Sequence, residues 1–186
     1  MFHTIFKVDS SIMKWIKIVF AGPLLVSTTT FSAEWIASYD NDEMRGTATK
    51  FLQTDSDNSV EFDFPYNGGS TMTLVLRSPK TELKGDQKAE DLKPNEAILL
   101  ISKGQFSCNS YNGCEISVKF DNDKIQKYKM SPAESGRSDV IFFDKSNGFI
   151  KSIPNHKKLI IEADFYQAGP KQFKFNLEGY TTPKQG

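Results

Sequence analysis

Apolar residues alternate with polar ones through much of the chain. In "CEISVKF", Ile116, Val118 and Phe120 lie two positions apart. Successive side chains of a β-strand point to opposite faces, so this spacing predicts a strand with one buried face. The other alternating segments, with the residues expected to point inward, are 60–64 (Val60, Phe62, Phe64), 72–76 (Met72, Leu74, Leu76), 159–165 (Leu159, Ile161, Ala163, Phe165) and 173–177 (Phe173, Phe175, Leu177).

Two further segments, "EAILLI" and "DVIFF", are apolar without alternation, which is typical of strands in the middle of a sheet. The segment "KIQKYKM" predicts an edge strand, because lysine at a sheet edge discourages pairing with other chains. The "NGGS" after Tyr66 predicts a turn, and therefore a β-hairpin of residues 60–66 with 70–77. Residues 78–95 are polar and predict a long surface connection.

One short helix is expected in "KSNGFIKSIPN", ending before Pro154. Together these segments give about nine short strands, separated by turn signals at fairly regular spacing. Such a pattern favours an all-β fold, a single antiparallel β-sandwich or a partly open barrel. We expect this one domain to span residues 34–186.

The first 33 residues have the features of a signal peptide. Lys14 and Lys17 precede an apolar run, residues 18–26, which is too short to span a bilayer, and small polar residues follow. We expect cleavage after Ser32 or Ala33, with Met13 as the true start of translation. An extended leader beginning at Met1 and an uncleaved membrane anchor are the alternatives. The rest of the chain has no other apolar run of membrane-spanning length, so the mature protein is predicted to lie free in the periplasm of a Gram-negative bacterium.

The charge of the mature chain is nearly balanced. Without the leader, which contains Lys7, Lys14, Lys17 and Asp9, 20 basic residues face 22 acidic ones. Nucleic-acid-binding proteins usually have a basic excess. The composition therefore argues against a nucleic-acid partner and against attachment to anionic lipid by charge.

Cys108 and Cys114 are the only cysteines of the chain. A single pair in an exported protein is expected to be oxidised. A two-residue turn at Asn112 and Gly113 would hold the two cysteines out of reach, whereas a five-residue loop, 109–113, places them opposite each other at the tip of a hairpin. The alternative is a redox or metal site, but zinc needs further ligands, and His156 is the only histidine after the leader.

Residues that would indicate catalysis or a cofactor do not form a recognisable motif. The chain has no Gly-x-Ser-x-Gly, phosphate loop or dinucleotide fingerprint. Three acidic clusters lie at 40–43, 55–57 and 121–123. The clusters at 55–57 and 121–123 lack the glycine and glutamate positions of an EF-hand. We interpret the clusters as polar turns, and a looser calcium site in a loop is the alternative. The sequence predicts no catalytic residue, no cofactor and no metal.

Several short motifs resemble a group of exported bacterial proteins. They are Trp35 with Asp42 and Met44, "LVLR" ending at Arg77, "VKFDNDKIQKY", "GFIKSI" and "FKFNLEGY". The chain resembles the periplasmic accessory proteins of type VI secretion systems, the VasI or TagO type. In that group a cysteine tends to follow the central arginine, whereas Ser78 follows it here. The "C…GC" segment is more distantly similar to the invasion-associated locus B type.

We therefore expect a non-enzymatic periplasmic protein that binds another protein of the cell envelope. The expected contacts are aromatic and amide side chains in turns, because exposed aromatic residues are enriched at interfaces: Tyr66, Tyr111, Asn112 and Tyr180. One alternative is an envelope hydrolase or carbohydrate binder that uses acids such as Asp40, Asp42 and Asp144. Another is a carrier of small apolar ligands inside a barrel.

Overall fold

The computed structural model describes residues 34–108, 114–181 and 183–186, and about half of these residues lie in β-strands. The strands are β1 (Ile36–Asp42), β2 (Thr47–Asp55), β3 (Val60–Phe62), β4 (Gly68–Ser70), β5 (Met72–Arg77), β6 (Thr81–Glu82), β7 (Glu96–Ile101), β8 (Cys114–Phe120), β9 (Gln126–Pro132), β10 (Val140–Phe143), β11 (Lys158–Phe165), β12 (Gly169–Asn176) and β13 (Lys184–Gln185). The helical elements are η1 (Ala89–Asp91), α1 (Ser146–Ser152) and η2 (Ile153–Asn155).

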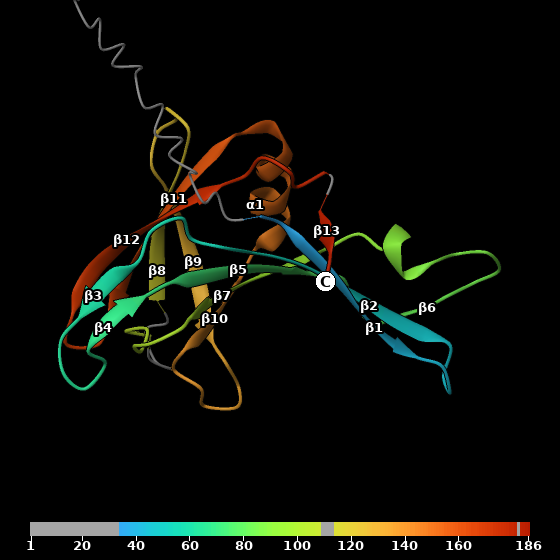
Figure 1. The fold of residues 1–186 in the computed structure, drawn as a ribbon, viewed down its shortest axis with the longest axis horizontal. Coiled ribbons are helices and arrows are strands. Elements are labelled where there is room, and N and C mark those ends of the chain that lie inside the picture. The colour runs from blue at the N-terminus through green and yellow to red at the C-terminus, as the bar shows by residue number, and fades with distance from the viewer. Residues whose placement is uncertain (1–33, 109–113, 182) are drawn as a thin grey trace, which may run out of the picture. The chain divides into compact units, whose positions relative to one another are not determined.

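One large sheet contains most of the strands (Figure 1). Its order is β12-β11-β8-β9-β10-β7-β5-β2-β1-β13, with β6 paired to β2, and β3 and β4 form a separate two-stranded ribbon. Every pair is antiparallel except β1 with β13. The predicted all-β antiparallel fold is confirmed, and in the part of the chain that the structure describes the sheet does not close into a barrel.

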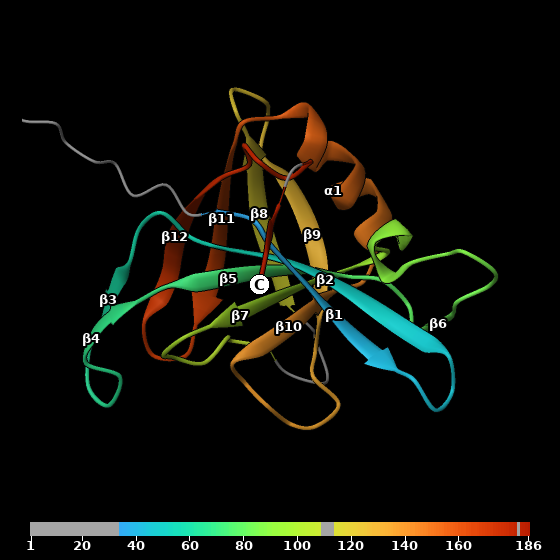
Figure 2. The same ribbon diagram turned by 45° about the vertical axis from the view of Figure 1, so that its right-hand side comes forward.

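The sheet folds over so that its two halves share one core. In Figure 2, β8, β9, β11 and β12 lie behind β5 and β7 and cross them steeply. Phe175 of β12 and Leu76 of β5 belong to the same buried cluster. The edge of β12 is also joined by the connection between β2 and β3: the Asp57 amide donates to the Lys174 carbonyl at 2.7 Å, and the Lys174 amide donates to Asn58 Oδ1 at 2.7 Å. The two halves therefore pack as a sandwich.

The predicted helix is present as α1 followed by η2, and it packs against the core. Phe149 and Ile150 are buried. The Phe149 ring centroid lies 4.3 Å from that of Phe143 and 5.7 Å from that of Phe120. Ser146 Oγ accepts a hydrogen bond from the Ala97 amide at 2.9 Å, which ties the start of the helix to β7.

Most of the side chains expected to point inward are buried. The alternating residues of β5, β8, β11 and β12 are at most 3 % exposed. The prediction is wrong for Phe64, since 84 % of its surface is exposed. The strand ends at Phe62, and the following residues turn toward β4, so the alternation continues in the sequence beyond the end of the strand.

The predicted hairpin of 60–66 with 70–77 is wrong in its pairing. Residues 60–62 pair with 68–70, whereas β5 lies between β2 and β7. The chain leaves the large sheet at Ser56, just after β2, and rejoins it at Met72, where β5 begins. Two hydrogen bonds join these two residues: the Ser56 amide donates to the Met72 carbonyl, and the Met72 amide donates to Ser56 Oγ. The β3–β4 ribbon is thus an excursion between two neighbouring strands.

The lysine-rich segment predicted as an edge strand, residues 124–130, does not lie at an edge. As β9 it pairs with β8 on one side and β10 on the other. Strands β1, β2, β4, β6 and β13 have no counterpart among the predicted segments, and the described residues form thirteen strands where about nine were predicted. Residues 78–95 are largely exposed, as expected, although Ala89 and Leu92 are buried against Ala48.

Candidate binding cleft

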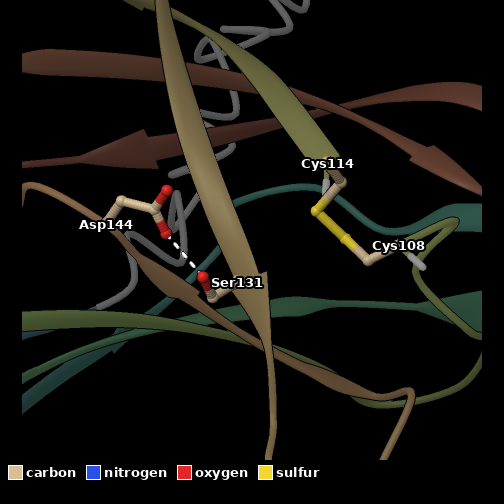
Figure 3. The surroundings of a disulfide bond; sticks show 4 residues. All are labelled: Cys108, Cys114, Ser131 and Asp144. Atoms are coloured by element: carbon tan, nitrogen blue, oxygen red, sulfur yellow. Dashed lines mark hydrogen bonds between the residues drawn. A yellow bond between two sulfur atoms is a disulfide. The ribbon is translucent and has the colours of Figure 1, made fainter. Parts of the chain in front are cut away.

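Cys108 and Cys114 form a disulfide in the structure, with Cα atoms 4.8 Å apart (Figure 3). Their place in the fold differs from the predicted hairpin tip, because β7 and β8 are not neighbours in the sheet. The segment before Cys108 instead pairs with the end of β11 through an antiparallel bridge of Phe106 with Phe165. Since β8 also runs antiparallel to β11, both segments follow the same edge of β11 in the same direction, and the disulfide ties them together.

The four expected partner contacts divide into two groups. Tyr111 and Asn112 lie outside the described residues. Tyr66 packs against the core, and its hydroxyl oxygen accepts a hydrogen bond from Gln105 Nε2 at 2.5 Å. Tyr180 packs edge-on against the Trp35 ring at 5.1 Å between centroids, and burial raises the pKa of its hydroxyl. Both tyrosines thus have a structural role, and a contact with a partner stays a prediction.

A cleft of about 1400 Å³ brings together residues that are far apart in the sequence. Part of its lining lies on the face of the sheet that points away from the core, here named the outer face, and the rest includes Tyr128 and Phe143 on the core side and the start of α1. Its lining residues come from seven elements and their connections: Asp40, Thr49, Phe51, Arg77, Ser78, Pro79, Lys80, Asn95, Glu96, Lys127, Tyr128, Lys129, Phe143, Asp144, Lys145, Ser146, Asn147 and Gly148.

Strand register explains how the outer-face residues of the cleft meet. Phe51 of β2 lies opposite Arg77 of β5, and Arg77 lies opposite Glu96 of β7. Arg77 Nε donates to Glu96 Oε2 at 2.6 Å, and the two side chains form an ion pair. On the other wall, the Asp144 amide donates to the Lys129 carbonyl at 3.1 Å. The sheet thereby places a row of aromatic and charged side chains across one face.

Three aromatic rings contribute apolar surface to the cleft. Phe51 and Tyr128 are half-buried, and Phe143 is buried. Tyr128 packs edge-on against Phe143 at 5.6 Å and against Phe149 at 5.7 Å between centroids. Burial raises the pKa of the Tyr128 hydroxyl. The core thus holds Tyr128 and Phe143 in place, whereas Phe51 lies outside the core cluster, and both Phe51 and Tyr128 are only partly shielded from solvent.

Cationic side chains outnumber carboxylates in the cleft. The cations are Arg77, Lys80, Lys127, Lys129 and Lys145, and the carboxylates are Asp40, Glu96 and Asp144. Two of these lysines are paired with carboxylates outside the lining: Lys80 with Asp42 at 3.1 Å and Lys127 with Glu115 at 2.6 Å. Among the residues described, Lys129 and Lys145 have no carboxylate within ion-pair distance.

An apolar patch adjoins the cleft on the same face of the sheet. Val75 lies opposite Ile98, which lies opposite Phe142, and Leu100 lies opposite Val140. None of these residues belongs to the core cluster. Ile98 and Val140 are 7 % and 6 % exposed, and the other three are half-buried. The outer face of an antiparallel sheet is commonly polar, so these five side chains give this part of the face an unusual apolar character.

The candidate acids of the hydrolase alternative are only partly brought together. Asp40 and Asp144 both line the cleft, where Ser131 Oγ donates to Asp144 Oδ1 at 2.7 Å (Figure 3). Asp42 is outside the lining. Hydrogen bonds from the Lys80 and Arg45 side chains lower the pKa of its carboxyl, the opposite of what a general acid requires.

The acidic cluster at 121–123 has a structural role in the turn after β8. Asp121 has a positive φ of 40°, and its Oδ1 accepts hydrogen bonds from the amides of Lys157 at 3.2 Å and Lys158 at 2.8 Å. Asp123 Oδ2 lies 3.1 Å from His156 Nε2. Across the described ranges, no three His, Cys, Asp or Glu side chains are placed to hold a metal ion.

His156 is held between acceptors. Its Nδ1 lies 2.7 Å from the Ser152 carbonyl. The hydrogen bond to that carbonyl raises the pKa of the imidazole, burial opposes this rise, and the carboxylates of Asp123 and Asp121 add to it. Because both ring nitrogens face acceptors, the doubly protonated imidazolium fits the site best.

The cleft was not predicted from the sequence, although two signals for it were present. The first was the pair of apolar runs that became β7 and β10, since apolar residues at successive positions occupy both faces of a strand. The second was the alternation of Lys127 and Lys129 with Tyr128. No other signal links Phe51 with Lys129, because only the strand order places them in one cleft.

Comparison with known proteins adds no relative: the chain matches no protein-family model, no curated protein and no solved structure. The similarity to the VasI or TagO type is not tested by this result and stays a prediction. No helix in the described part of the chain is both long and apolar enough to cross a membrane.

Proposed function

We propose that the chain is an exported, non-enzymatic module of the cell envelope that binds a partner protein in the cleft. The observation that carries this proposal is the outer face of β5, β7 and β10. There, half-buried apolar side chains lie beside a row of charged ones. Interfaces between proteins combine an apolar centre with a charged and polar rim, and this face offers both.

Export is supported by the leader-like first 33 residues and by the cysteine pair. Disulfides persist in oxidising compartments such as the bacterial periplasm and are rare in the cytosol. The resemblance to periplasmic accessory proteins points the same way. Cell fractionation followed by N-terminal sequencing tests export. The expected product is a periplasmic chain beginning at Ala33 or Glu34, whereas an unprocessed chain in the cytosol or in the membrane would overturn this part of the proposal.

Binding in the cleft is tested by site-specific photocrosslinking in the native host. A photoreactive amino acid replaces Phe51 in the cleft, and a matched variant carries it at Tyr166, which is 57 % exposed and outside the lining. We expect a discrete protein adduct from position 51 and not from position 166. Absence of an adduct at position 51, or the same adducts from both positions, would contradict a partner in the cleft.

A carbohydrate binder is the second candidate, because three carboxylates, those of Asp40, Glu96 and Asp144, line one cleft with aromatic rings. Carboxylates bind sugar hydroxyls, and rings bind sugar faces through their apolar surface. Titration with soluble cell-wall glycan fragments separates the two candidates. Saturable glycan binding that Asp144→Asn abolishes would favour the carbohydrate binder over the protein-binding module.

A further inference from the structure

We infer that the Asn58 side chain blocks the edge of β12 and thereby prevents this strand from pairing with β12 of a second copy of the chain. Two observations carry the inference: the position of β12 at the end of the sheet, and the hydrogen bonds that cover its edge. Asn58 and β12 contribute nothing to the cleft lining, so the inference does not depend on the proposed function.

Strand β12 is the last strand of the large sheet, and in the described part of the chain it pairs with β11 alone within that sheet. The backbone groups of Gln172 and Lys174 point away from β11, because they bond to the segment on the other side. Pro170 has no amide hydrogen, which weakens one end of this edge. The remaining amides and carbonyls form a row to which a strand of another chain could add.

The segment after β2 covers the middle of this edge. The Lys174 amide donates to Asn58 Oδ1 at 2.7 Å, and Asn58 Nδ2 donates to the Gln172 carbonyl at 3.1 Å. The Asp57 amide donates to the Lys174 carbonyl at 2.7 Å. An added strand would need the same three backbone groups, and two of them are bonded by the Asn58 side chain.

Asparagine is suited to this position because its side chain offers both an acceptor and donors. An aspartate could accept from the Lys174 amide but could not donate to the Gln172 carbonyl. The backbone of Asn58 is itself held in place, since Ser56 Oγ donates to the Asn58 carbonyl at 2.7 Å. Ser56 is buried and is joined to β5 at Met72. The block is therefore anchored to the opposite half of the sandwich.

Without the Asn58 side chain, the edge would keep only the bond from Asp57. In purified protein, β12 of another molecule offers the same row of backbone groups, and two such edges can pair antiparallel about a two-fold axis. Phe173 and Phe175 would stay in the core of each copy, because their side chains are perpendicular to the direction of pairing. Pairing would therefore satisfy the edge without disturbing the packing.

Sedimentation velocity tests this association. Asn58→Ala is compared with the wild type and with Asn155→Ala, which loses a similar bond away from β12: Asn155 Nδ2 donates to the Lys151 carbonyl at 3.0 Å. We expect the sedimentation coefficient to rise with concentration for Asn58→Ala only. Should that variant not fold by circular dichroism, Asn58→Ser, whose side chain is too short to reach both backbone groups, replaces it. A constant sedimentation coefficient at position 58, or an equal rise in the control, would overturn the inference.

A second substitution locates the association at β12. Gln172→Pro, added to Asn58→Ala, removes an amide hydrogen that points to the edge, and proline is tolerated there because that amide does not bond to β11. We expect this double variant to stay monomeric at every concentration. Association that persists in the double variant would place the contact elsewhere and contradict the inference.

Hydrogen exchange reports on the edge itself. In dilute Asn58→Ala, the Lys174 amide should exchange about tenfold faster than in the wild type, because its acceptor is gone. At a concentration where the variant associates, the same amide should become protected again. An exchange rate at Lys174 that does not change with the substitution would show that Asn58 does not cover the edge.

Discussion

Leu99 and Leu100 are adjacent in β7 and point to opposite faces of the same sheet. Leu99 is fully buried in the core cluster, between Leu74 and Ile141 in the neighbouring strands. Leu100 lies on the outer face, opposite Thr73 and Val140, and is half-buried. The two residues have the same side chain and the same strand, so their difference isolates what each face of the sheet contributes.

The comparison indicates that the two faces have separate roles. The core face holds closely packed apolar side chains from both halves of the sandwich, and such packing provides most of the stability of a small domain. The outer face carries the cleft, its charged row and the apolar patch. Substitutions on the core face are therefore expected to affect stability, and substitutions on the outer face to affect binding.

The largest expected effect compares the two leucines directly. Leu99→Ala should lower the free energy of unfolding by about 3–5 kcal/mol, because it removes buried methyl groups and leaves a cavity. Leu100→Ala should cost only about 1 kcal/mol, since much of the lost contact is with solvent. Urea unfolding followed by circular dichroism measures both, and equal losses would contradict the separation of roles.

Like the residues of the core face, the disulfide is expected to affect stability and not binding. Its cysteines lie outside the cleft lining, and they close a loop of about seven residues, which in the chain-entropy model contributes about 2.4 kcal/mol. Cys108→Ser/Cys114→Ser should lose stability of that order and keep its affinity for a cleft ligand. The wild type in reductant is the control, because it should lose the same stability without any substitution.

A smaller effect on stability is expected from the titration of His156, which follows α1 and η2 in the chain. The pKa of His156 is raised above its usual value of 6.5, chiefly by the Ser152 carbonyl. The stabilisation that protonated His156 contributes is therefore complete below about pH 6.5 and is lost as the pH rises through the folded-state pKa. NMR titration should give a pKa above 6.5, and His156→Gln should remove this part of the pH dependence of unfolding. A measured pKa below 6.5 would contradict the assignment.

The smallest effect on stability is expected on the outer face itself. Glu115 holds Lys127 in a solvent-exposed ion pair and raises the pKa of that lysine. Such pairs contribute little to stability, so Glu115→Gln should leave urea unfolding unchanged. It should nevertheless lower the pKa of Lys127, because it removes the carboxylate that raises this pKa, and NMR titration of the lysine measures the change. Glu134→Gln, an exposed acid outside the lining, is the control.

The sequence predicts the local structure of this protein better than it predicts which strands pair in the sheet. Alternation correctly placed Leu74, Ile116 and Phe173 inside, since the period of a strand depends only on near neighbours. It failed at Phe64, where the same pattern continues beyond the end of the strand. The edge position expected for β9 was also wrong, because strand order depends on long-range contacts that lysine content does not encode.

The candidate site was less predictable for the same reason. Phe51, Arg77, Glu96 and Lys129 come from four strands, and only the order of the sheet brings them into one cleft. The turn residues expected to contact a partner were chosen by residue type alone. Of these, Tyr66 and Tyr180 pack against the core, because an aromatic side chain in a turn can cover the end of a sandwich as readily as contact solvent.

The most direct test of the central claim is to map the bound ligand on the protein by NMR. The ¹⁵N-labelled protein is titrated with the partner protein that crosslinking at position 51 identifies. We predict that the largest amide shift changes fall in β2, β5, β7 and β9, around Phe51, Arg77, Glu96 and Lys129. Shift changes confined to the disulfide segment or to the β3–β4 ribbon would contradict the assignment of the outer-face cleft as the binding site.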